Sequence, residues 1–337
     1  MCGIVAAVAD RNIVSVLLEG LRKLEYRGYD SAGLALINAS GLQRLRAVGR
    51  VAELTAQVEE TGAAGNTGIA HTRWATHGVP SERNAHPHIS GGLAVVHNGI
   101  IENHEALRAL LVADGYTFTS DTDTEVIAHL VARELKTEGD FFAAVRASIA
   151  QLQGAYAIAV LREVDPSRVI VAREGSPLLL GLADEGNYAA SDASALLQVT
   201  RRIVYLENGD CAELMRGSYR ITRVDGTPVE RGETESQLSA DAVELGKYRH
   251  YMQKEIFEQP VALSNTLEML GAARSIQPGL FGANTEEVLN DVRQVLIIAC
   301  GTSYHAGLVA RYWLEAIAGI PCNVEVASEY RYRESVP

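Results

Sequence analysis

Seven short apolar segments follow one another between residues 155 and 224, and this pattern constrains the fold more than any other feature of the chain. The segments read AYAIAVL, RVIVAR, PLLLGL, NYAAS, RIVYL, DCAELM and YRITRV. Turn residues such as Glu174-Gly175-Ser176 and Asn208-Gly209-Asp210 separate them, which is typical of short strands joined by turns. The predicted helices are grouped between blocks of strands, so we expect antiparallel sheets covered by helices and not a repeating βαβ unit.

The first half of the chain supplies those helices and further strands. Apolar residues recur at helical spacing over residues 12–26, at Val14, Leu17, Leu18, Leu21 and Leu24. Further helices are predicted over residues 51–60, 103–115, 122–135 and 140–152, strands over 3–8, 34–37, 69–74 and 93–99, and a loop over 27–33. The predicted fold class is therefore α+β.

The length of the chain predicts more than one domain, because 337 residues are too many for one ordinary core. A strand, a tight loop, a helix and a second strand are predicted over residues 294–327, and this βαβ unit indicates a parallel sheet. Two strands do not complete a doubly wound domain. We therefore expect one domain over residues 2–235, a polar linker over 236–250, and an incomplete second domain over 251–337.

Composition excludes several functions. The net charge of −12 and the pI near 5.3 have the wrong sign for a protein that binds nucleic acid or an anionic membrane. No apolar run approaches the roughly 20 residues of a membrane-spanning helix. The four cysteines form no C-x-x-C pair, which argues against a zinc ribbon or a disulfide framework. The expected compartment is the cytoplasm, where thiols stay reduced.

Cys2 directly follows the initiator methionine and precedes the predicted strand at residues 3–8. If Met1 is removed, one residue carries both a thiol, with a reference pKa near ~8.5, and a free α-amine, with one near ~7.7 to 8.0. An amine poised near the working pH suits a general base for the thiol. The alternative is a structural cysteine in a buried strand, and position 2 alone does not decide between the two.

Three polar stretches carry further candidate groups. In HTRWATHG, the planar fork of Arg73 suits a carboxylate. In VVHNGIIEN, the amide of Asn98 and the backbone N–H of Gly99 form a possible oxyanion-stabilising pair. In SDTDTEVIAHL, Asp123 offers a carboxylate to a ligand ammonium.

Each of these stretches also has a purely structural explanation. The alternative for HTRWATHG is a surface arginine followed by a core tryptophan. The alternative for VVHNGIIEN is a β-turn, because Asn-Gly is a common turn dipeptide. Thr122 and Glu125 have the spacing of a capping box, and the helix dipole favours Asp123 at a helix start.

Two further groups of residues are candidate ligand sites. The histidines at positions 71, 77, 86, 88 and 97 suggest a metal site, but no H-E-x-x-H or comparable spacing supports it, and we expect neither a metal nor a cofactor. In VLIIACGTSYHAG, Thr302 and Ser303 at a helix N-terminus offer an anion site for a phosphorylated small molecule. No lysine follows as a P-loop requires, and the alternative is that Ser303 only caps the helix.

Together these motifs resemble a known family. MCGIV, LEYRGYDSAG, GIAHTRWATHG, NAHPH, VVHNGIIENH and DTDTEVIAH, in this order, resemble the glutaminase domain of the glucosamine-6-phosphate synthase family. YRHYMQKEIFEQP and CGTSY resemble the start of its sugar-isomerase (SIS) lobe. The resemblance implies a four-layer αββα N-terminal-nucleophile (Ntn) hydrolase fold, followed by part of an SIS domain.

The resemblance also implies roles for matching residues. Cys2 would attack the glutamine carboxamide to give a glutamyl thioester and ammonia, with Asn98 and Gly99 as the oxyanion hole. Arg73 would hold the glutamine α-carboxylate and Asp123 its α-ammonium, Thr76 and His77 would line the pocket, and Trp74 would gate an ammonia channel. Arg27 and Gly28 would lie in a closing loop, and Thr302 and Ser303 would contact the sugar phosphate.

In the complete enzyme of this family, ammonia aminates fructose 6-phosphate to give glucosamine 6-phosphate, and the implied assembly is a homodimer. The family's second phosphate loop and its isomerase residues lie beyond Pro337, so this chain is expected to retain the glutaminase half-reaction. Two alternatives stay open. One is another Ntn amidotransferase, such as an amidophosphoribosyltransferase, and the other is a non-catalytic phosphosugar-binding module.

The role of Cys2 predicts that Met1 is absent from the mature protein. Peptide mass spectrometry of the N-terminus should find Cys2 as the first residue. A variant that retains an extra residue before Cys2 should lose glutaminase activity, because the α-amine is moved to the wrong residue. Full activity in a chain that keeps Met1 contradicts the prediction.

Overall fold

The computed structural model describes residues 2–74, 78–236, 248–269 and 285–334. The chain divides into two compact units, Met1–Tyr248 and Arg249–Pro337.

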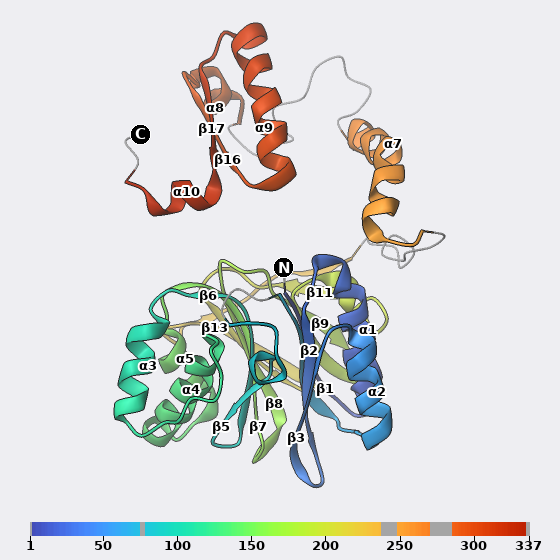
Figure 1. Cartoon of the computed structure of the whole chain (residues 1–337), viewed down its shortest axis with the longest axis vertical. Helices are drawn as coiled ribbons and strands as arrows, with labels where there is room; N and C mark the ends of the chain where they lie inside the picture. The colour runs from blue at the N-terminus through green and yellow to red at the C-terminus, as the bar shows by residue number, and fades with distance from the viewer. Residues whose placement is uncertain (1, 75–77, 237–247, 270–284, 335–337) are drawn as a thin grey trace. The chain divides into compact units, whose positions relative to one another are not determined.

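The first unit contains two stacked sheets with antiparallel ladders between neighbouring strands (Figure 1). The first sheet has the order β15 (Glu233–Glu235), β11 (Arg202–Tyr205), β9 (Leu179–Ala183), β10 (Gly186–Ala190), β1 (Gly3–Ala9), β4 (Thr67–Arg73), β2 (Ser31–Asn38), β3 (Gly41–Val48). The second sheet has the order β14 (Pro228–Val229), β13 (Ser218–Arg223), β12 (Asp210–Met215), β8 (Asp165–Glu174), β7 (Gly154–Arg162), β6 (Leu93–Ile101), β5 (His88–Ser90).

Helices cover the outer face of each sheet, which gives four layers (Figure 1). Helices α1 (Val14–Leu24) and α2 (Val51–Thr61) lie on the first sheet, and α3 (His104–Ala113), α4 (Thr124–Glu138) and α5 (Phe141–Ile149) lie on the second. Three apolar clusters fill the three spaces between the layers. The predicted antiparallel sheets covered by helices are therefore confirmed.

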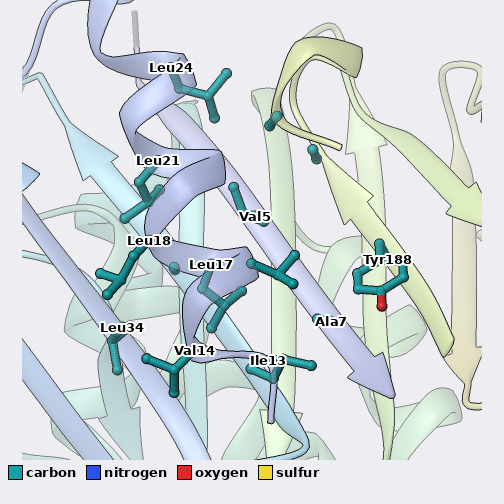
Figure 2. Packing of buried hydrophobic residues seen from close by; sticks show 14 of the residues in the cluster. Val5, Ala7, Ile13, Val14, Leu17, Leu18, Leu21, Leu24, Leu34 and Tyr188 are labelled. Carbon is teal, nitrogen blue, oxygen red and sulfur yellow. The ribbon is translucent and has the colours of Figure 1, made fainter. Parts of the chain in front are cut away.

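Strand β1 is buried on both faces. Val5 and Ala7 belong to the cluster beneath α1, whereas Ile4, Ala6 and Val8 belong to the cluster between the sheets. Figure 2 shows the helix side of this arrangement, with Val14, Leu17, Leu18, Leu21 and Leu24 of α1 packed over β1. An apolar run without alternation is what a strand covered on both faces requires.

Some boundaries differ from the sequence prediction. Strand β2 begins at Ser31, inside the predicted loop at 27–33, and β3, β5, β14 and β15 were not predicted. At Gly33, an added Cβ would lie 2.2 Å from the carbonyl oxygen of His86, so the glycine permits a close approach to another chain segment and is not a loop signal. Strand β3 lies at the edge of its sheet and is half-buried along most of its length, so its sequence lacks a clear alternation.

The second unit contains a parallel βαβ unit. Strand β16 (Val295–Ala299) pairs with β17 (Cys322–Val326), and α9 (Gly301–Trp313), followed by a π-helical turn at Leu314–Ala318, connects them. The other helices are α7 (Tyr251–Met269), α8 (Thr285–Asp291) and α10 (Ala327–Tyr332). Leu296 and Ile298 remain 44% and 42% exposed, as expected for a two-stranded sheet without cover on both faces. Among the described helices, none combines the length and apolar character needed to cross a membrane.

The packing of α1 on β1 predicts the stability cost of a core truncation. Leu21→Ala should lower the free energy of unfolding of the first unit by about 2–5 kcal/mol, because Leu21 is fully buried between the helix and the sheet. Val48→Ala, at a valine that is 49% exposed, should change it by less than about 0.5 kcal/mol. Urea unfolding of both variants, followed by circular dichroism, checks this, and equal effects contradict it.

Candidate active site

The thiol of Cys2 lies at the N-terminal end of β1, against the backbone of Trp74. The N–H of Trp74 donates to Sγ at 3.1 Å, and Sγ lies 3.6 Å from the Trp74 carbonyl oxygen. Burial raises the pKa of the Cys2 thiol, while the Trp74 hydrogen bond and the Arg73 charge oppose that shift. A thiol with a raised pKa needs a base to become a nucleophile.

Asn98 and Gly99 come from β6, in the other sheet. The Asn98 carboxamide crosses the space between the sheets and donates through Nδ2 to the carbonyl oxygen of Cys2 at 3.2 Å. Gly99 has a φ of +130° and faces Tyr156 in β7. The predicted oxyanion pair therefore lies beside the cysteine, and it is part of a strand instead of the alternative β-turn.

Arg73 ends β4, and its side chain is almost completely buried. One guanidinium nitrogen donates to the Gly78 carbonyl at 2.9 Å, and another lies 3.6 Å from the carboxylate of Asp30. The alternative of a surface arginine is wrong. Asp30 was missed by the sequence analysis, because nothing in a loop motif marks an acidic residue as the partner of a distant arginine.

Asp123 is buried at the start of α4, where its Oδ2 accepts the N–H of Ile101 at 2.9 Å. The predicted capping box of Thr122 and Glu125 is wrong, because Asp123 is the N-cap residue and makes no side-chain cap. Glu125 instead accepts backbone N–H groups from Thr119 at 2.9 Å and from Ser120 at 2.7 Å. Glu125 thus fixes the turn that leads into Asp123.

The indole of Trp74 packs on Gly28. A Cβ at Gly28 would lie 2.1 Å from the indole, and its φ is +90°, so only glycine permits this contact. Trp74 is 54% exposed, so the alternative of a core tryptophan is wrong. The backbone of Arg27 lies in a short 3-10 turn, Glu25–Arg27. Thr76 and His77 lie outside the described residues.

Three buried histidines, His71, His86 and His88, form a cluster of rings. The rings of His71 and His86 stack with centroids 4.2 Å apart, and His86 and His88 meet edge to face at 5.0 Å. Burial lowers the pKa of both His71 and His88 to about 3. Among the described residues, no group of three or more histidine, cysteine, aspartate or glutamate side chains is placed to hold a metal ion.

These elements enclose one small pocket. Its lining residues are Cys2, Arg73, Trp74, His86, His97, Gly99, Thr122, Asp123 and Thr124. The guanidinium is complementary to a ligand carboxylate, and the carboxylate is complementary to a ligand ammonium. The thiol beside them is placed to meet an electrophilic carbon of the same ligand. Four lining residues were not predicted as part of the site: His86, His97, Thr122 and Thr124. The two histidines had been noted only as members of a histidine group, and Thr122 only as part of a capping box.

The predicted phosphate-binding residues lie in the second unit. Thr302 and Ser303 occupy the first turn of α9, whose N-cap residue is Cys300, and both are exposed. Ser303 is therefore not the cap.

A larger cavity of about 510 Å³ lies by β9, β10 and the turn between β12 and β13. Because Gly186 pairs with Ala9 while Gly3 pairs with Thr72, this cavity lies at the opposite end of β1 from Cys2. None of the predicted site residues lines it.

Family models match both units. A glutamine amidotransferase domain matches residues 71–198, and an SIS domain matches residues 288–335.

Curated proteins match over the whole chain. Glutamine–fructose-6-phosphate aminotransferase (isomerizing) of Shewanella oneidensis is 57% identical over 99% of this chain and 55% of its own length. The protein of the same name from Vibrio vulnificus is 56% identical over 100% of this chain and 55% of its own length. The chain corresponds to the N-terminal glutaminase domain and the start of the SIS domain of glutamine–fructose-6-phosphate aminotransferases. It spans about half the length of these relatives.

Solved structures support the fold. Glutamine phosphoribosylpyrophosphate amidotransferase from B. subtilis superposes with a TM-score of 0.61 at 20% identity, over 96% of this chain and 65% of its own. A structure described as the allosteric regulatory enzyme of purine biosynthesis gives a TM-score of 0.58 at 26% identity, over 66% of this chain and 49% of its own. The predicted αββα Ntn fold, with a small parallel sheet after it, is confirmed.

The geometry at Gly99 predicts that the protein does not tolerate alanine there. A Cβ would lie 1.9 Å from the Ala155 carbonyl oxygen, and φ is +130°. Gly99→Ala should therefore lower the thermal midpoint much more than Gly115→Ala, where φ is +88° but no atom lies within 4 Å. The control should cost about 1 kcal/mol of strain. Equal thermal midpoints for the two variants contradict this assignment.

Proposed function

We propose that this chain releases ammonia from L-glutamine, with Cys2 as the nucleophile. The observation that carries the proposal is the single pocket that Cys2 shares with Arg73, Gly99 and Asp123. A guanidinium and a carboxylate are complementary to the α-carboxylate and α-ammonium of an amino acid. The glutamine amidotransferase domain that matches residues 71–198 also supports glutamine as the substrate.

The proposed reaction has two steps. With Met1 removed, the α-amine of Cys2 takes the thiol proton, and Sγ attacks the side-chain amide carbon of glutamine. The C–N bond breaks, the proton passes to the leaving nitrogen, and ammonia departs from a glutamyl thioester. Water then hydrolyses the thioester to glutamate and restores the thiol.

Asn98 and Gly99 would stabilise the oxyanion of both tetrahedral intermediates. An amide and a backbone N–H fixed in a partly buried site need no reorganisation as charge develops. Trp74 would close the pocket together with Gly28, against which its ring packs. Thr76, His77 and Arg27 are assigned to the same glutamine site by the family resemblance.

In a chain that contains the whole SIS domain, the ammonia would aminate fructose 6-phosphate, with Thr302 and Ser303 at the sugar phosphate. The match of an SIS domain to residues 288–335 favours this acceptor over a phosphoribosyl one. We place the amidotransferase domain at residues 2–235, the linker at 236–250 and the SIS part at 251–337. The homodimer stays a prediction. The four free cysteines suit the reducing cytoplasm that we assign to the protein.

An ammonia-release assay with glutamine tests the proposed function. Cys2→Ala should reduce the rate by about 10³-fold or more, because no other group replaces the nucleophile. A glutamine-like electrophile such as diazo-oxo-norleucine should label Cys2, as located by peptide mass spectrometry. Cys300→Ala, at an exposed cysteine of the second unit, should keep both activity and labelling. Labelling at another residue, or an active Cys2→Ala, overturns the proposal.

A further inference from the structure

The carboxamide of Asn98 is held at both ends. Nδ2 donates to the Cys2 carbonyl oxygen at 3.2 Å, and Oδ1 lies 2.9 Å from Nε2 of His71. His71 belongs to β4 of the first sheet and Cys2 directly precedes β1 of the same sheet, whereas Asn98 belongs to the second sheet. The Asn98 side chain is therefore clamped across the space between the sheets.

The chemistry of the two partners determines which way the amide faces. A backbone carbonyl oxygen only accepts hydrogen bonds, so the NH₂ group of Asn98 must face Cys2. Its oxygen must then face His71, and Nε2 of His71 must carry a proton. The Cys2 carbonyl uses one of the two hydrogens on Nδ2, and the other is available to a bound substrate.

We propose that His71 is a positioning residue that, through Nε2–H, holds the Asn98 carboxamide with its NH₂ group toward the reacting carbon. This inference rests on the proposed glutaminase function. If the hydrogen bond from His71 were lost, the carboxamide could rotate about its terminal torsion, which has a broad energy minimum. The amide would then present its NH₂ group to the oxyanion for only part of the time.

The surroundings of His71 keep its ring and its proton in place. In β4, His71 faces Ile4 of β1 and Gly33 of β2, and its side chain is fully buried. The His86 ring stacks on it. Burial lowers the pKa of His71 to about 3, against the opposing effect of its hydrogen bond to Asn98. The ring thus stays neutral at working pH, and its hydrogen bond to Asn98 does not titrate there.

Two other roles for His71 make different predictions. A general base for Cys2 would need to contact the thiol, but the hydrogen bonds of Sγ are to the backbone of Trp74. A residue that only fills the core would change stability without affecting catalysis through Asn98. A double-mutant cycle separates the latter role from positioning.

The experiment compares His71→Phe, Asn98→Ala and the double variant in the ammonia-release assay. His71→Phe should lower kcat about 10- to 100-fold, which is somewhat less than the effect of removing an oxyanion donor. Its KM for glutamine should stay within about threefold of the KM of the unmodified chain. In the Asn98→Ala background, His71→Phe should lower kcat by no more than about twofold. His71→Gln keeps an N–H donor and should recover most of the lost kcat, with an unchanged pH profile.

His129→Phe is the matched control. His129 is also a buried histidine, but it bonds Ser90 and lies beside Glu125, not Asn98. Any effect of this variant should be the same in both backgrounds. The proposal is overturned if His71→Phe lowers kcat by the same factor with and without Asn98, or if it shifts an apparent pKa near neutrality.

An activity-independent measurement separates this inference from the proposed function. If the unmodified chain releases no ammonia, the proposed function fails, and ¹⁵N NMR of the His71 ring then decides the inference. A neutral ring protonated at Nε2 from about pH 5 to 9, with an Asn98 NH₂ signal that shifts in His71→Gln, supports it. A ring that titrates in this range, or an unshifted Asn98 signal, overturns it. The same spectra serve if His71→Phe does not fold.

Discussion

The site depends on the burial of β1 on both of its faces. A cysteine at position 2 would ordinarily belong to a frayed end. Here the residues after it are held by β4 and β10 on either side, by α1 above and by the second sheet below. A chain end fixed in this way can carry a nucleophile whose position is set by the core of the domain. The apolar run after Cys2 is thus a requirement of the chemistry as well as of the fold.

The two sheets contribute different parts of the site. The first sheet provides His71 and Arg73 and holds Cys2 at the start of β1, and the second provides Asn98 and Gly99. Contacts between them, such as that of Asn98 with the Cys2 carbonyl, are made only when the sheets have packed at the right separation. The cluster of Ile4, Ala6 and Val8 with the apolar residues of the second sheet sets that separation. The packing between the two sheets therefore also sets the geometry of the proposed oxyanion pair.

Much of the fold follows from local patterns, whereas the contacts of the site do not. The strand at β1 and the helical face of α1 could be predicted, because burial imposes a pattern on consecutive residues. The start of β2 could not, because Gly33 looks like a loop residue until the His86 carbonyl is placed against it. Asp30 was not predicted as a site residue, and His71 was considered only as a possible metal ligand, for a related reason. Their partners, Arg73 and Asn98, are reached through sheet pairing and sheet stacking, and one sequence carries no signal for those pairs.

The incorrect capping box shows how a local rule loses to tertiary structure. Thr122 and Glu125 have the right spacing, but each finds a stronger set of partners elsewhere. Thr122 bonds His88 at 2.9 Å, and Glu125 collects donors from the preceding turn. Burial raises the pKa of the Glu125 carboxyl, but His129 and those donors together lower it, so the group stays ionised in the first turn of α4. A buried carboxylate satisfied in this way holds the turn rigidly. The turn thereby fixes Asp123, which lines the same pocket as Cys2.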